Sequence, residues 1–391
     1  MKTTDIPSEF EKMRSLEDDE VRSAVLSLLN DPAFVKIVKG IVKGVPIWVH
    51  KLYTKRFKTV NSFQVGMICP FLNRILKKAT TGFTNDFSEL PEGREDFIYL
   101  SNHRDIVLDS AYLDYILIMM RGQKSVEIGI GNNLLIHPWI ETLVRLNRSF
   151  IVNRSATAAE LLESSKQLSR YIRFVIEQKK APVWLAQREG RAKDSDDRTQ
   201  KSVLKMLAMS GPDDMPLSQR LQSLHICPLT ISYEYDPCDW LKAAEFQLKR
   251  DNPEFTKSEQ DDLDNMKTGI FGFKGHMHYH VSAPIDDEIA ALDSSVPRNQ
   301  FLDQVAQIID RHIFKGYRIY PCNRIALDML RGDNAQAAYY SEEQKHAFQT
   351  YLDGQLAKID IPNPDWDFLK ERILTMYANP LINHLNAING Q

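Results

Sequence analysis

Short apolar segments alternate with segments of helical periodicity between residues 86 and 300, and this alternation constrains the fold more than any other feature. The apolar segments are rich in β-branched or aromatic residues and bounded by turn or charged residues, as buried strands are. They read DFIYLSNH, VEIGIG, SFIVNR, APVWLAQ and HICPLTISYE. Between them, SAYLDYILIMMRG and AAELLESSKQLSRYIRFVIEQKK have the apolar spacing of helices. Strands that alternate with helices predict an α/β fold, in which helices cover both faces of a sheet.

Two helical regions flank this segment. Residues 1–85 have helical patterns and end in the turn-rich sequence TTGFTND. Residues 301–391 are helical to the end, with a break at DIPNPDW. A further strand, HMHYHVSAPI, follows an acidic helical insertion around residues 255–266. We therefore expect three parts: a helical region at 1–85, an α/β domain with a mixed sheet at 86–300, and a C-terminal helical region at 301–391.

The overall composition is that of an ordinary globular protein, with 43% hydrophobic residues and a net charge of −3. The cysteines, Cys69, Cys227, Cys238 and Cys322, have neither disulfide-framework nor metal-ligand spacing, so we expect no zinc site and no metal. The sequence MKTTDIPSEF lacks the basic start and apolar core of a signal peptide. The apolar runs are also too short to span a bilayer. These features favour a cytoplasmic protein.

A basic block lies in the N-terminal region, where no acidic residue occurs between Asp31 and Asp86. Its cations are Lys36, Lys39, Lys43, Lys51, Lys55, Arg56, Lys58, Arg74, Lys77 and Lys78. Apolar and aromatic residues, among them Trp48, alternate with these charges, so the block is amphipathic. It can be a helical subdomain with a solvated basic face, or a segment that binds a membrane surface. Nucleic acid is not expected, because the whole chain is near neutral and carries no nucleic-acid module.

Polar clusters follow four of the expected strands, reading NHRDIVLD, NRS, QREGR and YEYD. In open α/β sheets, sites lie where loops leave the carboxyl ends of strands. A histidine beside a carboxylate, as at His103, can take a proton from a hydroxyl. Arg154 and Arg191, at two strand ends, could hold a phosphate through bidentate contacts. Neither a P-loop nor a dinucleotide fingerprint occurs, which disfavours kinase and dehydrogenase chemistry.

The order of these motifs resembles the glycerol-3-phosphate and lysophosphatidate acyltransferases. NHRDIVLD is similar to the histidine block of that family, RSFIVNR to its second block, REGRAKDS to its Glu-Gly-Thr-Arg block, and CPLTISYE to its proline-containing fourth block. The segments GNNLLIHPWIETLVRLNRSF and KGHMHYHVSAPID also resemble family segments. The resemblance covers roughly residues 95–290 and implies the α/β fold of the glycerolipid acyltransferases.

Two blocks depart from the family pattern. The family has aspartate five positions after the histidine, where this chain has Leu108, and the available carboxylates are Asp105 and Asp109. We favour Asp109 as the partner of His103, at the start of a helix that it can also cap. The third block reads Glu-Gly-Arg-Ala, so its phosphate-binding arginine is either Arg191 or Arg188.

The resemblance implies an O-acyltransferase that moves a fatty acyl group to the hydroxyl of a glycerol-phosphate or lysophospholipid acceptor, directly and without an acyl-enzyme. The donor would be acyl-CoA or acyl-carrier protein, and no metal or cofactor would be required. By this resemblance His103 is the general base and Asp109 orients it. Arg154 and Arg191 bind the acceptor phosphate, and Glu189 and Gly190 shape the acceptor pocket.

The resemblance leaves open the acceptor and the membrane relation. Because the third block is imperfect, a non-phosphate acceptor such as a lyso-aminolipid is an alternative. Because the aspartate is displaced, a non-catalytic lipid-binding protein on the same scaffold is another. Since substrates of this class reside in bilayers, we expect the N-terminal region to hold the protein peripherally on the inner face of the membrane.

Overall fold

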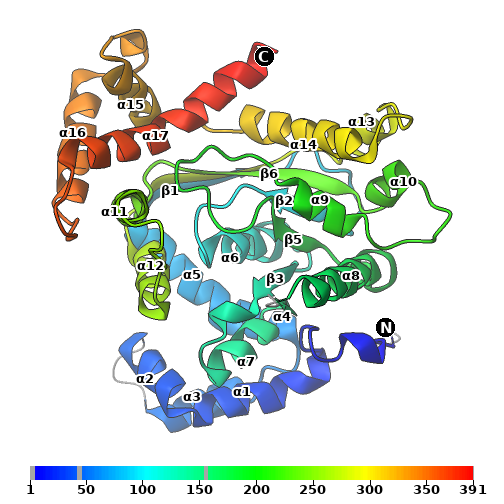
Figure 1. The fold of residues 1–391 in the computed structure, drawn as a ribbon. Coiled ribbons are helices and arrows are strands. Elements are labelled where there is room, and N and C mark those ends of the chain that lie inside the picture. Colours follow the sequence, from blue (N-terminus) through cyan, green and yellow to red (C-terminus); the bar gives the residue numbers. More distant parts are fainter. Residues whose placement is uncertain (1–4, 42–45, 154–156, 391) are drawn as a thin grey trace.

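A computed structural model describes residues 5–41, 46–153 and 157–390 of the chain, and a sheet lies at its centre (Figure 1). The described residues form one seven-stranded sheet. Its strands are β1 (Thr80–Asp86), β2 (Ile98–Ser101), β3 (Glu127–Gly131), β4 (Ser149–Val152), β5 (Val183–Ala186), β6 (Ile226–Tyr233) and β7 (Gly275–Val281).

The sheet has the order β1-β7-β6-β2-β5-β3-β4. Strands β2 to β6 run parallel to one another, whereas β7 is antiparallel to β6 and β1 is parallel to β7. The sheet is therefore mixed, as expected. The carboxyl ends of β2, β3, β4, β5 and β6 meet at one edge, and this edge collects the loops of all four sequence blocks.

Helices surround the sheet, and their bounds follow. They are α1 (Val21–Asn30), α2 (Pro32–Ile41), α3 (Ile47–Thr54), α4 (Val60–Phe63), α5 (Cys69–Ala79), α6 (Leu108–Tyr115), α7 (Pro138–Leu146), α8 (Ala158–Phe174), α9 (Lys201–Leu207), α10 (Leu217–Gln222), α11 (Asp239–Asp251), α12 (Glu259–Phe271), α13 (Asp286–Ala290), α14 (Arg298–Lys315), α15 (Pro321–Arg331), α16 (Glu342–Leu356) and α17 (Trp366–Ile388). Local signals set several of these bounds. For example, Pro321 occupies the first turn of α15, and Gly332 ends that helix with a left-handed φ of 66°.

Two apolar layers enclose the sheet. Leu100 and Ile226 on one face pack against α8, α9 and α14. Tyr99 and Leu229 on the opposite face pack against α5 and α6. This three-layer arrangement explains why the strands are apolar throughout, since both of their faces are buried.

The N-terminal and C-terminal helices lie at opposite ends of the molecule (Figure 1). Helices α1 and α2 form an apolar cluster of their own with α4 and α7. Helices α11, α15, α16 and α17 form another. Within the described residues, no helix combines the length and the apolar character that a bilayer crossing needs. Lys43 of the basic block lies outside the described residues.

The segment TTGFTND, which the sequence predicts as a turn, is instead the edge strand β1. The segment becomes a strand despite its turn-forming composition because its backbone pairs with β7. In this pairing Gly82 lies opposite His276. A Cβ at Gly82 would lie 2.6 Å from the His276 ring, so the glycine permits this pairing.

Candidate active site

The loops that leave β2, β5 and β6 meet at the carboxyl edge of the sheet. Asn102, directly after β2, joins them: its Nδ2 donates to the Ile231 carbonyl (3.0 Å) and its Oδ1 accepts from the Ile231 amide (2.8 Å). The same Nδ2 lies 3.2 Å from Asp197 Oδ2 in the loop after β5. This buried amide thus fixes the chain immediately before His103.

His103 contacts Asp109. The distance from its Nδ1 to Asp109 Oδ2 is 2.8 Å, and the two side chains are 13% and 0% exposed. The same carboxylate oxygen accepts from the backbone amides of Arg104 (2.7 Å) and Asp105 (3.1 Å). Its other oxygen accepts from the Tyr233 hydroxyl (3.3 Å). Asp109 is therefore surrounded by donors, which suits a carboxylate, and a proton on Nδ1 leaves Nε2 as the acceptor of the neutral ring.

Asp105 has a different task. Its Oδ1 accepts from the amides of Val107 and Leu108, both at 2.8 Å, and so caps the turn that leads into α6. Burial and the neighbouring Asp109 carboxylate raise the pKa of Asp105. Of the two aspartates that the sequence offers, the structure thus brings Asp109 to the histidine ring. Leu108, at the position where the family has its aspartate, is buried in the first turn of α6.

Arg104 forms a buried ion pair that the sequence did not reveal. Its Nη2 lies 2.6 Å from Asp197 Oδ2, and the side chains are 6% and 0% exposed. The Tyr317 hydroxyl donates to the same oxygen of Asp197 (2.5 Å). Burial raises the pKa of Asp197, and the Arg104 guanidinium opposes that shift. Asp197 belongs to KDSDDR, a charged stretch whose composition is typical of a solvent-exposed loop. No local sequence signal therefore marks Asp197 or Tyr317 as members of the site.

The third block forms the loop after β5. Glu189 and Gly190 are both exposed at its tip. Gly190 has a left-handed φ of 67°, and apart from its two chain neighbours no atom of the described residues lies within 4 Å of the position that a Cβ would take. The glycine therefore has a backbone reason to be there, independent of any close approach by a substrate.

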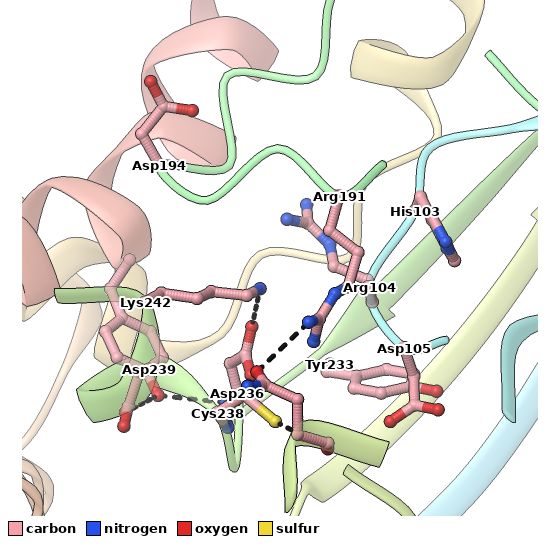
Figure 2. A network of polar contacts seen from close by, with 12 residues as sticks. His103, Arg104, Asp105, Arg191, Asp194, Tyr233, Asp236, Cys238, Asp239 and Lys242 are labelled. Atoms are coloured by element: carbon pink, nitrogen blue, oxygen red, sulfur yellow. Dashed lines mark hydrogen bonds and ion pairs between the residues drawn. The ribbon is translucent and has the colours of Figure 1, made fainter. Parts of the chain in front are cut away.

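Arg191 points from this loop toward a polar network under the C-terminal helices (Figure 2). Its Nη2 donates to Asn265 Oδ1 (3.2 Å), while its buried Nη1 has no hydrogen-bond partner among the described residues. Beside it, Asp236 Oδ2 lies 2.5 Å from the ammonium of buried Lys242. Burial raises the pKa of Asp236, but the Lys242 ammonium, the Cys238 amide and the Arg191 guanidinium together hold it below its ordinary value.

Arg188 and Arg154 complete the set of expected arginines. Arg188 is half-buried, and its Nε has no partner in the described part of the chain, so the alternative between Arg188 and Arg191 stays open. Arg154 lies outside the described residues.

Three comparisons with known proteins bear on this arrangement. Residues 84–232 match the family model described as Acyltransferase. This stretch contains the first three sequence blocks and all but the last two residues of the fourth. A crystal structure of the 1-acyl-sn-glycerophosphate (LPA) acyltransferase PlsC from Thermotoga maritima aligns with a TM-score of 0.38 and 11% identity, over 74% of this chain and 97% of that chain. No curated protein matches the chain.

Proposed function

We propose that the chain, whose residues 84–232 match the family model described as Acyltransferase, transfers a fatty acyl group to a hydroxyl of a glycerol-phosphate or lysophospholipid acceptor. The donor is acyl-CoA or acyl-carrier protein. The observation that carries the proposal is the contact between His103 and Asp109 at the carboxyl edge of the sheet. The match to the Acyltransferase model supports the reaction class, and the acceptor and donor are our inference.

In the proposed reaction His103 is the general base. Its Nε2 takes the proton of the acceptor hydroxyl while the oxygen attacks the thioester carbonyl of the donor. The tetrahedral intermediate then collapses, the carbon–sulfur bond breaks, and the imidazolium returns its proton to the leaving thiolate. Asp109 holds Nδ1 protonated and stabilises the imidazolium, a role supported by its burial and its four donors. The product is an ester, and the mechanism needs no metal, cofactor or acyl-enzyme.

In this proposal, residues of the second and third sequence blocks bind the acceptor. We assign the acceptor phosphate to Arg154 and Arg191, with Glu189 and Gly190 at the edge of the acceptor pocket. The support for Arg191 is its buried Nη1, a charged donor with no partner among the described residues. Such a donor is costly to bury unless an anion completes it.

We also propose that the protein works peripherally on the cytoplasmic face of a membrane. Trp48 and Leu52 of α3 are 65% and 59% exposed, although large apolar side chains are usually buried. The cations Lys36, Lys39 and Lys55 are exposed in the same helical region. Apolar groups among lysines suit an anionic lipid surface, where each lysine contributes about 1 kcal/mol.

The test is acyl transfer from radiolabelled acyl-CoA and acyl-carrier protein to a panel of acceptors. We expect labelling of glycerol 3-phosphate or lysophosphatidate, and a loss of about 10²- to 10⁴-fold in turnover in His103→Ala. His346→Ala, at an exposed histidine of α16, is the matched control and should keep full activity.

Two results would contradict the proposal. Labelling of lyso-aminolipids with no labelling of phosphate-bearing acceptors would change the substrate class. Vesicle binding without transfer from either donor to any acceptor would instead favour a lipid-binding protein on the same scaffold.

A further inference from the structure

One buried carboxylate holds the residues on both sides of His103. Asp197, in the loop after β5, is 0% exposed, and its Oδ2 lies 3.2 Å from Asn102 Nδ2 and 2.6 Å from Arg104 Nη2. Asn102 and Arg104 are the chain neighbours of His103. The backbone that carries the imidazole is therefore anchored, through both of its neighbours, to a single oxygen atom of the loop after β5.

The C-terminal region supplies a third donor to this oxygen. The Tyr317 hydroxyl, in the segment between α14 and α15, donates to Asp197 Oδ2 (2.5 Å). The Tyr317 side chain is buried, and the Arg104 guanidinium lies 5.7 Å from the centroid of its ring, within the range of a cation–π contact. Tyr317 thus contacts both members of the ion pair, although it lies outside residues 84–232, the stretch that matches the family model.

Burial makes each donor of this ion pair important. Burial raises the pKa of Asp197, and the Arg104 guanidinium, the Tyr317 hydroxyl and the Asn102 amide each oppose that shift. The other carboxylate oxygen of Asp197, Oδ1, is buried and has no hydrogen-bond partner among the described residues. Loss of the tyrosine hydroxyl would therefore leave a buried, charged acceptor with fewer donors, which is unfavourable.

Arg104 connects this ion pair to the proposed catalytic pair. Its backbone amide donates to Asp109 Oδ2 (2.7 Å), the oxygen that also contacts His103 Nδ1 (2.8 Å). The Arg104 and Asp109 side chains are 6% and 0% exposed, so water does not replace a weakened contact. A shift of Arg104 relative to Asp197 would therefore move the imidazole and its carboxylate partner together.

Packing on β6, an interior strand of the sheet, fixes the position of Tyr317. The backbone amide of the next residue, Arg318, donates to Ser232 Oγ (3.1 Å). On the other side of Tyr317, a Cβ at Gly316 would lie 2.5 Å from Thr230 Oγ1, so the chain approaches the strand this closely because residue 316 is glycine. The tyrosine hydroxyl is thus held by a rigid element, as a positioning group requires.

We propose that Tyr317 is a positioning residue for His103, acting through Asp197 and Arg104, so that the C-terminal region completes the catalytic loop. The proposal rests on the proposed function, because it takes His103 as the general base. It extends that function beyond the four sequence blocks. Since Tyr317 acts on the geometry of the imidazole, its loss should lower the rate of acyl transfer and leave substrate binding nearly unchanged.

The experiment compares Tyr317→Phe with the wild type in the acyl-transfer assay. The substitution keeps the ring and removes only the hydroxyl. We expect kcat to fall about 10- to 100-fold, the range for a lost hydrogen bond to a charged group, with KM changed less than about threefold. Tyr320→Phe is the matched control, because Tyr320 is a buried tyrosine of the same segment whose hydroxyl contacts His276 Nδ1 (3.0 Å) instead. It should keep the wild-type kcat.

The imidazole itself gives a readout that does not depend on turnover. In protein with isotope-labelled histidine, the ring resonances of His103 are identified by their absence in His103→Ala. Tyr317→Phe should shift these resonances, whereas Tyr320→Phe should leave them at their wild-type positions. Arg104→Lys is a second variant of the same connection: it keeps the charge but changes the contact with Asp197, and it should shift the same resonances.

Two results would overturn the positioning role. One is wild-type kcat with unchanged His103 resonances in Tyr317→Phe. The other is an equal loss of kcat in Tyr317→Phe and Tyr320→Phe that follows the loss of folded protein, since a purely structural hydrogen bond behaves in this way. If the wild type transfers no acyl group to any acceptor, the proposed function fails, and the imidazole resonances then decide alone whether Tyr317 positions His103.

Discussion

At the scale of single residues, Asp105 and Asp109 lie four positions apart and take different tasks. Asp109 accepts from the His103 ring, two backbone amides and a tyrosine, whereas Asp105 accepts from the amides of the turn before α6. Both side chains are buried, so burial alone does not separate them. The two side chains differ in the direction in which they point, and that direction depends on where α6 begins.

This difference predicts unequal effects of two similar substitutions. Asp109→Asn removes the charge that holds the His103 proton on Nδ1 and should lower kcat about 10³- to 10⁴-fold, with KM changed only a few-fold. Asp105→Asn keeps one acceptor oxygen for the turn and should cost less than about tenfold in kcat. Steady-state kinetics measures both, with thermal unfolding to confirm that each variant is folded. Equal losses in the two variants would mean that order in the loop, and not orientation of the imidazole, limits the rate.

At the scale of elements, α12 passes directly against the loop that follows β2. A Cβ at Gly269 of α12 would lie 2.1 Å from Asp105 Oδ2, so this helix approaches the turn closely only because residue 269 lacks a side chain. Residues 259–266 of the predicted acidic insertion thus belong to a helix that packs against the turn of Asp105.

Two glycine-to-alanine substitutions test this contact. An alanine in a helix is ordinarily favoured by about 1 kcal/mol over glycine. Gly354→Ala, in α16, has no atom of the described residues within 4 Å of its Cβ position apart from its chain neighbours and the backbone of its own helix, and it should show that gain. Gly269→Ala should instead destabilise the protein by about 1–3 kcal/mol, because the new methyl group overlaps a buried carboxylate. Denaturant unfolding measures both free energies, and a gain in Gly269→Ala would show that α12 can move away at no cost.

At the scale of the whole molecule, the two helical ends do different things to the same central domain. The N-terminal helices form their own cluster and leave Trp48 and Leu52 exposed. The C-terminal region instead reaches the carboxyl edge of the sheet, since the Tyr317 hydroxyl and the side chains of α17 bond to the loop after β5.

The exposed pair at the N-terminal end gives a prediction about membranes. Trp48→Ala with Leu52→Ala should lower partition onto vesicles that contain anionic lipid by about tenfold or more, because each side chain contributes 1–3 kcal/mol on burial. Salt should weaken the remaining binding through screening. Vesicle co-sedimentation measures the partition, and Trp366→Ala, at a half-exposed tryptophan of α17, is the control. Unchanged binding in the double variant would place the membrane contact elsewhere.

Much of the fold was predictable because its signals are local. The apolar runs of β2 to β6 and the helical spacing of α6 and α8 are encoded in adjacent residues, and the structure confirms each of them. TTGFTND was predicted wrongly because its strand conformation depends on β7, which lies far along the chain. A weak local preference yields to backbone pairing that only the tertiary fold supplies.

The candidate site divides in the same way. By itself, the sequence determined the α/β class, the four blocks at strand ends and the histidine that they point to, since each is a matter of short-range pattern. Only the tertiary structure decided that Asp109 reaches His103 and that Asp197 and Tyr317 hold Arg104. The reason is physical: ion pairs and pockets join residues far apart in the chain, and the topology of the sheet, which no local pattern encodes, brings those residues together.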